Sequence, residues 1–290
     1  MTEPVVQLLI VTAEGFGKVR PAIAGFAQDL PENLHITVAS GLAGDPGELA
    51  VPGAETRHFP GESVFHLRSR LPSLAADCDW LVILEDHNHV TRQWFAALQM
   101  VLRNVPDDVR VVIGGTSNLT SRDDWSWANY IHTLGFHWAP AISEPVEPIT
   151  FNIVLRRKTL PDEDFTLGAY EAGFVHGLMA NAVASSDFPI DHVQFRKAPG
   201  VFKYHWHNGR VTGAFMRRHY RGGLRHVYAH VRDVVGPRLR RLDRVIDEHP
   251  QSGLLPRGTK RRLRMLSLCH AAGALFGGVA GEGQAPWGLE

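Results

Sequence analysis

Continuous apolar runs alternate with amphipathic segments over the first part of the chain. Residues 5–11 and 80–84 are almost wholly apolar, which is typical of strands buried on both faces of a parallel sheet. Further short strands are predicted at residues 34–39, 55–59 and 110–113. Helices are predicted between them at residues 19–30, 63–76 and 91–104, the last with Trp94, Leu98 and Val101 on one face. This alternation predicts an α/β fold built on a doubly wound sheet.

The pattern is less regular in the rest of the chain. Residues 149–156 predict one more strand, and residues 164–184 predict a helix in spite of three glycines. Basic helices are predicted at 213–234 and 238–248, and a last helix at 259–276 begins basic and becomes apolar. We therefore predict an α/β domain over residues 1–209 and a basic helical C-terminal extension over residues 210–290.

Charge is distributed unevenly along a chain whose formal net charge is zero. From Arg210 to Arg264 there are 15 Lys and Arg residues and four acids, which gives this segment a net charge of +11. Such a segment can meet phosphates, anionic lipid or nucleic acid, although a solvated helical surface explains it equally well. Aromatic residues are not interleaved with these basic residues as in single-strand binders, so nucleic acid is not the expected partner.

The sequence also indicates a compartment. Cys78 and Cys269 lie far apart and match no disulfide or metal spacing, which fits a reducing environment. The first apolar run has no basic segment before it, and no run reaches the ~18 apolar residues needed to cross a bilayer. We therefore expect a cytoplasmic protein, with peripheral attachment of the basic helices at the inner face of the membrane as an alternative.

Polar side chains that can bind a metal follow the clearest predicted strand. Glu85, Asp86 and His87 come directly after the apolar run at 80–84, and His89 is close behind. Ligands of open α/β sheets bind at the carboxyl ends of the strands. Carboxylates suit Mg²⁺ and Mn²⁺, and imidazole tolerates Mn²⁺ better than Mg²⁺. These residues therefore predict a divalent-cation site, and the alternative is an ordinary polar strand end.

Two further groups of residues are candidates for chemistry. His205 and His207, if the segment is extended, point to one face and complete a metal site or bind phosphate; exposed loop histidines are the alternative. Asp164 and Glu171 are carboxylates that can remove a proton from a substrate hydroxyl, although Asp164 also suits a helix N-terminus. Glu171 lies in an apolar context that a structural role explains less well.

Several common reaction classes lack their motifs. The chain has no phosphate-binding loop of the type Gly-x-x-x-x-Gly-Lys-Ser/Thr, and no Gly-x-Gly-x-x-Gly follows the first strand. It also has no Gly-x-Ser-x-Gly nucleophile elbow.

A set of stretches, in this order and spacing, resembles the family-2 glycosyltransferases, and most closely a bacterial subgroup with Glu-Asp-His in place of Asp-x-Asp. They are Leu-Arg-Ser-Arg at 67–70, Glu-Asp-His at 85–87, Trp94, the aromatic segments at 124–128 and 135–140, Phe-Asn-Ile-Val-Leu-Arg-Arg at 151–157, and Glu171. The resemblance covers roughly residues 5–230. It implies a GT-A (Rossmann-like) fold with a mixed, mostly parallel central sheet flanked by helices.

The resemblance also implies a reaction. The family moves a sugar, commonly a hexose, from a nucleoside-diphosphate sugar such as a UDP-sugar to an acceptor hydroxyl, usually with inversion and with Mn²⁺ or Mg²⁺. It implies that Asp86 binds the metal, with Glu85 and His87 beside it and with His205 or His207 as a late contact. The implied donor contacts are Thr12, Glu14, Arg68, Glu85 and Asp86. Glu171 is the implied base, and Asp164 is the reserve.

One departure from the family pattern supports a second hypothesis. The second strand of family members usually ends in an acid that contacts the nucleoside, but here it ends in Ala39, Ser40 and Gly41. Glu14 is the nearest substitute. The alternative is therefore a non-catalytic glycosyltransferase-like protein that binds a nucleotide, a sugar or a protein partner.

Overall fold

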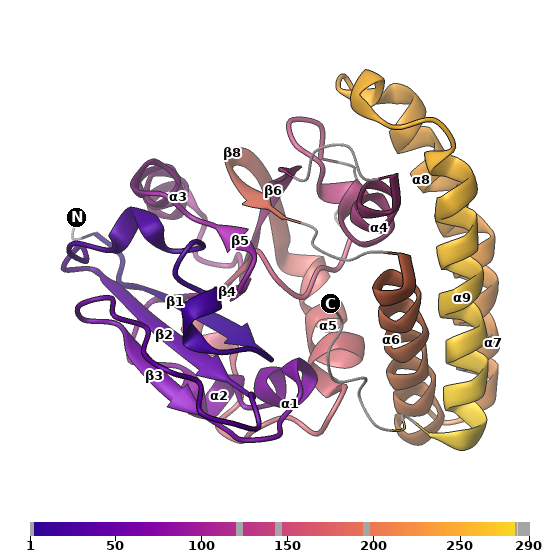
Figure 1. Cartoon of the computed structure of the whole chain (residues 1–290), viewed down its shortest axis with the longest axis horizontal. Coiled ribbons are helices and arrows are strands. Elements are labelled where there is room, and N and C mark those ends of the chain that lie inside the picture. The colour runs from indigo at the N-terminus through magenta and orange to yellow at the C-terminus, as the bar shows by residue number, and fades with distance from the viewer. Residues whose placement is uncertain (1–2, 120–123, 143–146, 194–197, 282, 284–290) are drawn as a thin grey trace. The chain divides into compact units, whose positions relative to one another are not determined.

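The computed structural model describes residues 3–119, 124–142, 147–193, 198–281 and 283 (Figure 1). The chain divides into two compact units. The first, here called the sheet unit, comprises Met1–Ser117 and Glu144–Val193, and the second, called the helical unit, comprises Asn118–Ser143 and Gln194–Glu290. The division predicted after residue 209 falls within helix α6 (Ala198–His219), and each unit is built from two separate stretches of chain.

A mixed eight-stranded sheet forms the sheet unit, with the strand order β3-β2-β1-β4-β7-β6-β8-β5. The strands are β1 (Val6–Thr12), β2 (Leu34–Ser40), β3 (Glu55–His58), β4 (Trp80–Glu85), β5 (Asn88–His89), β6 (Val111–Asn118), β7 (Ile153–Arg156) and β8 (Ala182–His192). The block β3-β2-β1-β4 is parallel, and β7 pairs antiparallel with both β4 and β6. The predicted α/β fold with a mixed sheet is therefore confirmed.

The first and fourth strands are central because apolar residues cover both of their faces. Every residue of β1 is buried, and β4 is buried up to its last residue. In the parallel register Val11 lies opposite both Ala39 and Glu85, so β1, β2 and β4 end at one edge of the sheet. The polar residues that follow these strands are thereby brought to the same edge.

Helices pack on this sheet from several parts of the chain. They are α1 (Val64–Ser69), α2 (Leu71–Leu74), α3 (Arg92–Asn104), α5 (Val175–Leu178), a π-helix (Tyr170–Phe174) and short 3₁₀ turns at Phe16–Lys18, Ala24–Phe26, Arg157–Thr159 and Met179–Asn181. Helix α3 begins where Thr91 Oγ1 accepts a hydrogen bond from the Trp94 amide. Its buried face, with Trp94, Phe95 and Leu98, joins the main core.

Two predicted helices are wrong. Residues 19–30 form turns and a 3₁₀ helix, because Gly25 packs so closely on Thr91 that a Cβ would lie 3.1 Å from Thr91 Cα, and Val90 donates a hydrogen bond to Ala22 O. Residues 164–184 are helical only in part. Gly168 has a φ of 82°, and the chain enters β8 at Ala182.

The helical unit contains α4 (Asp124–Leu134), α6 (Ala198–His219), α7 (Gly223–Val235), α8 (Pro237–Glu248) and α9 (Thr259–Ala280), with 3₁₀ turns at Gly135–His137 and Ser252–Leu254. The single helix predicted over 213–234 is two helices, since Gly222 adopts a φ of 75° between them. Helix α6 also begins before residue 205. His205 and His207 therefore lie on a helix, and the extended segment expected for them is wrong.

Helix α9 differs from the sequence expectation in one respect. Within the described ranges it is the one helix whose length and composition would allow it to cross a membrane, and half of its most apolar window is buried. Helices that form the core of a soluble unit pass the same test. Gly273 and Gly277 pack on α6 here: a Cβ would lie 2.3 Å from Trp206 O and 2.1 Å from Arg210 O, respectively.

Candidate metal site

The site begins at the carboxyl end of β4, where a tight turn follows Glu85. The side chain of Asn88 stabilises this turn, because its Oδ1 accepts a 2.7 Å hydrogen bond from the Glu85 amide. Asn88 and His89 form β5, which pairs antiparallel with the end of β8 so that Asn88 lies opposite His192. The pairing brings His192 to the turn that carries Glu85 and His87.

Three side chains converge at this point. The ligand atoms of Glu85, His87 and His192 all lie within 4.8 Å of one another. His87 Nε2 is 3.1 Å and His192 Nε2 is 3.7 Å from Glu85 Oε2, and the two imidazole rings are 4.5 Å apart. One carboxylate and two imidazoles form a mixed oxygen and nitrogen donor set that suits Mn²⁺ better than Mg²⁺. The residues therefore fit a divalent cation.

Asp86 lies beside this group and positions it. Its Oδ1 is 2.7 Å from His87 Nδ1, and its Oδ2 accepts a 2.5 Å hydrogen bond from Thr12 Oγ1 at the end of β1. A carboxylate on the second ring nitrogen fixes the orientation of a ligand histidine. In the described structure Asp86 is not one of the three converging groups.

Arg68 approaches Glu85 from the protein interior. Its side chain is 5% exposed, and its Nη2 lies 2.5 Å from Glu85 Oε1. Its Nη1 donates a 3.4 Å hydrogen bond to Thr150 Oγ1, and its guanidinium lies 6.0 Å from the centre of the Phe151 ring. Arg68 therefore holds one oxygen of Glu85, while the other oxygen faces the two histidines.

The electrostatics of the site favour positive charge between two ionised carboxylates. Burial opposes the charge on Glu85, but His87, His192 and Arg68 outweigh it and hold the pKa of this carboxyl well below its usual value. Burial likewise opposes the charge on Asp86, but His87 and Thr12 lower its pKa. Burial also opposes the charge on His87, but Glu85 and Asp86 raise its pKa to about 9.

The other predicted site residues of the sheet unit have varied surroundings. Glu14 follows β1, donates its amide hydrogen to Thr12 Oγ1, and pairs with Lys18 at 3.6 Å on the surface. Asp164 accepts hydrogen bonds from the Ser73 amide and hydroxyl, both at 3.1 Å. Glu171 lies in the π-helix, and its side chain is outside the described residues.

The two predicted histidines of α6 have partners in the helical unit. His205 is fully buried, and its Nε2 lies 2.8 Å from Asn129 Oδ1 on α4. His207 is also buried. Because residues two apart on a helix point to nearly opposite sides, the two do not share one face.

Sequence reasoning missed His192. The signal in the sequence is that apolar Phe188 and Ile190 alternate with Pro189 and Asp191, which places His192 at the next position of the apolar face; in the structure Phe188, Ile190 and His192 are buried. This period of two is typical of a strand, and His192 is its last inward position. It also missed Thr150, which binds Arg68 directly.

Similar proteins were found by comparing structures and not by comparing sequences. No protein-family model and no curated protein sequence matches the chain. A mannosyltransferase from Pyrobaculum calidifontis, solved with GDP-Man and Mn²⁺, matches with a TM-score of 0.54 at 12% identity over 96% of this chain and 88% of that one.

Two further solved structures are less similar to this chain, with TM-scores below 0.5. S. aureus TarS 1-349 matches with a TM-score of 0.46 at 10% identity, over 94% of this chain and 90% of that one. Glucosyl-3-phosphoglycerate synthase from Mycobacterium tuberculosis matches with a TM-score of 0.47 at 11% identity, over 68% and 74%. Together with the sheet topology, the mannosyltransferase match shows that this chain has the α/β, Rossmann-like fold of the GT-A glycosyltransferases.

Proposed function

We propose that the protein is a metal-dependent glycosyltransferase that moves a sugar from a nucleoside-diphosphate sugar to an acceptor hydroxyl. The observation that carries this proposal is the convergence of Glu85, His87 and His192 at the carboxyl ends of the parallel strands, where ligands of such sheets bind. The structural match to an enzyme solved with GDP-Man and Mn²⁺ supports it. We also propose that the protein is a member of family 2 and of its Glu-Asp-His subgroup.

Glu85, His87 and His192 would hold Mn²⁺ or Mg²⁺, and the cation would stabilise the negative charge of the diphosphate leaving group. Asp86 keeps the His87 ring in place through Nδ1. Arg68 acts through Glu85, because its guanidinium is already bound to that carboxylate. Direct coordination by Asp86, expected from the sequence, remains an alternative within this proposal.

The donor and acceptor roles rest on position in the fold. Thr12 ends β1 and Glu14 follows it, at the same edge as the metal site, where a nucleoside would lie. Glu171 remains the proposed base. Asp164 is the weaker choice, because Ser73 already uses both of its oxygens. We also propose that the reaction inverts the configuration at the sugar and that the protein is cytoplasmic. A contact of His205 or His207 with the metal or a phosphate is proposed as well.

Calorimetric titration of UDP and GDP, each with and without Mn²⁺, tests the metal site. We expect His192→Ala to lower cation-dependent nucleotide binding at least about tenfold, since removal of a metal ligand costs as much as or more than the 10–100-fold typical of its supporting residues. Asp86→Asn should lower it as well. His35→Ala, which removes an exposed histidine from β2, is the matched control. Wild-type binding by both His192→Ala and Asp86→Asn would refute the metal site.

The absence of an acid at the end of β2 favours a second candidate, a non-catalytic protein that binds a nucleotide or sugar. Ser40 ends this strand, and its hydroxyl donates a 2.6 Å hydrogen bond to Glu14 O. A screen of UDP-, GDP- and dTDP-sugars for hydrolysis or transfer separates the two functions. Release of nucleoside diphosphate by the wild type, lost in His192→Ala, supports the transferase; Mn²⁺-dependent binding without release supports the binding protein.

A further inference from the structure

Helix α9 carries an exposed apolar face in the helical unit. Met265, Leu268, Leu275, Phe276 and Val279 recur at helical spacing on its outward side, with Leu268 61% and Val279 85% exposed. The opposite side is the buried one, and it holds Leu263, Leu266, His270 and Ala274. The outward face therefore leaves a row of apolar side chains exposed in the part of the chain that the structure describes.

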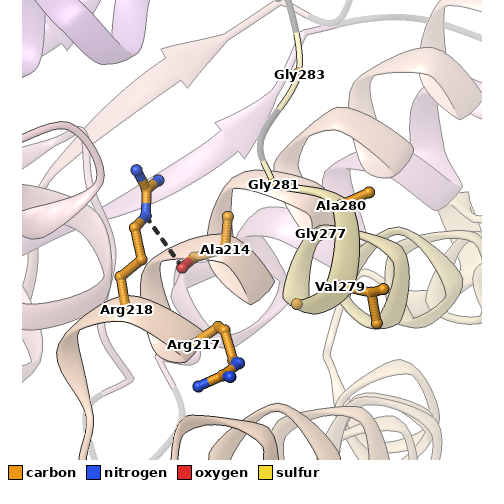
Figure 2. Close-up of a pocket in the computed structure, with 9 residues that line it drawn as sticks. Ala214, Arg217, Arg218, Gly277, Val279, Ala280, Gly281 and Gly283 are labelled. Atoms are coloured by element: carbon orange, nitrogen blue, oxygen red, sulfur yellow. Dashed lines mark hydrogen bonds between the residues drawn. The ribbon is translucent and has the colours of Figure 1, made fainter.

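Arginines border this face at its C-terminal end. Figure 2 shows Arg217 and Arg218 of α6 beside the last turn of α9, where they line a pocket of about 470 Å³ together with Gly277, Val279 and Ala280. The two side chains extend in different directions, so they form a broad basic border rather than a single anion clamp. Arg210 lies with its guanidinium 4.9 Å from the centre of the Phe276 ring.

Few acids balance these basic residues. Among the described residues, Arg217, Arg221, Arg225 and Arg232 have no ion pair with an acidic side chain. Two ion pairs of α9, Lys260 with Asp247 and Arg264 with Asp243, lie toward its N-terminal end. The charge of Arg217, which lies beside Val279 at the C-terminal end of the apolar face, is therefore available to an anionic partner.

We propose that the outward face of α9, with Arg217 and Arg218 at its end, docks on the surface of an anionic lipid bilayer. Exposed apolar side chains enter the boundary of the acyl chains while arginines meet the lipid phosphates, which is the pattern of interfacial helices. A second copy of this chain fits less well, because its arginines would face these arginines. This inference goes beyond the proposed function and does not depend on it.

The attachment is peripheral rather than membrane-spanning. Gly273 and Gly277 press α9 against backbone oxygens of α6, and His270 is buried on the same side of the helix. Half of the most apolar window is buried in this way, so one face alone is left for lipid.

Flotation of the full-length protein with vesicles tests this docking. We expect it to float with vesicles that contain phosphatidylglycerol and to remain unbound with pure phosphatidylcholine. Leu268→Ser combined with Val279→Ser should reduce the bound fraction about tenfold, because less apolar surface enters the bilayer. Arg217→Glu combined with Arg218→Glu should reduce it by a similar or larger factor, and added salt should weaken wild-type binding.

Matched changes elsewhere serve as controls. Leu254→Ser alters an equally exposed leucine outside α9, and Lys158→Glu reverses an exposed charge in the sheet unit. Both should bind vesicles as the wild type does, and far-UV circular dichroism checks that all variants are folded. Equal binding to neutral and anionic vesicles, or vesicle binding unchanged in both double variants, would overturn the proposal. So would a dimer in light scattering that Leu268→Ser with Val279→Ser dissociates.

Discussion

Arg68 is a cation with almost no access to solvent, and its charge is tied to that of Glu85. Its guanidinium reaches Glu85 Oε1 at 2.5 Å and Thr150 Oγ1 at 3.4 Å. A buried charge is costly when its partner is removed, even where the intact pair adds little to stability. Arg68 therefore supports the proposed site by keeping Glu85 ionised and in place.

Removing this cation should destabilise the protein. We expect Arg68→Met to lower the free energy of unfolding by about 3 kcal/mol, the lower end of what breaking a buried pair costs, because His87 still balances Glu85. Adding Glu85→Gln should recover part of this loss. Urea unfolding followed by circular dichroism gives both values.

The surface pair Arg57 and Glu55 is the matched control. Its atoms are also 2.5 Å apart, but both side chains are more than half exposed. Because exposed ion pairs contribute roughly 0–1 kcal/mol, Arg57→Met should change stability little. Equal effects of Arg57→Met and Arg68→Met would contradict a buried role for Arg68.

The candidate site shows which residues sequence reasoning can bring together. Glu85, Asp86 and His87 were predicted because they are consecutive and follow an apolar strand. His192 comes far later in the chain and reaches them through the pairing of β5 with β8. That pairing involves a strand of two residues, which is too short to leave an apolar pattern in the sequence.

At the scale of elements, the strands that are buried on both faces were predicted correctly, whereas segments shaped by tertiary contacts were not. Strands β1 and β4 are buried on both faces and leave continuous apolar runs, so they were predicted. The segment at 19–30 has a helix-like apolar pattern, but a tertiary contact at Gly25 overrides it. The close packing of α6 on α9 was not predicted, because it depends on glycines that individually suggest flexibility.

Helix α9 offers a direct test of this packing. A Cβ on Gly273 would lie 2.3 Å from Trp206 O, a backbone atom of α6 that cannot move alone. We expect Gly273→Ala to destabilise the helical unit by about 2 kcal/mol, since overpacking of this kind costs more than the helix gains from alanine. Differential scanning calorimetry measures the effect.

Gly253→Ala is the control for this change in the same unit. A Cβ there would meet nothing within 4 Å, so we expect its unfolding temperature to stay close to that of the wild type. An unchanged unfolding temperature for Gly273→Ala as well would show that α6 and α9 do not pack through this glycine.

At the scale of the whole molecule, the buried histidines are unevenly distributed. Apart from the metal site, most of them lie in the helical unit. Four helices of this unit, α4, α6, α7 and α9, contribute His132, His205, His230 and His270 to one cluster. The rings of His132 and His205 are 4.3 Å apart, and the Nε2 atoms of His230 and His270 are 3.0 Å apart. Burial and the neighbouring histidines, together with Arg238, hold the pKa values of His132 and His270 well below 6.5.

The stability of this unit should therefore fall in mild acid. Below pH 6.5 the unfolded chain takes up protons that His132 and His270 exclude in the folded state, so their contribution to stability is complete above this value and is lost as the pH falls. Between pH 7 and pH 5 we expect a loss of up to about 2 kcal/mol for each of His132 and His270. Urea titrations at half-unit steps of pH measure it. In His132→Gln the slope should decrease by about one proton, whatever the change in absolute stability. Leu224→Gln changes an exposed residue of α7 that does not titrate, so it should keep the wild-type slope. A His132→Gln slope equal to that of the wild type would show that the folded cluster accepts protons as readily as the unfolded chain does.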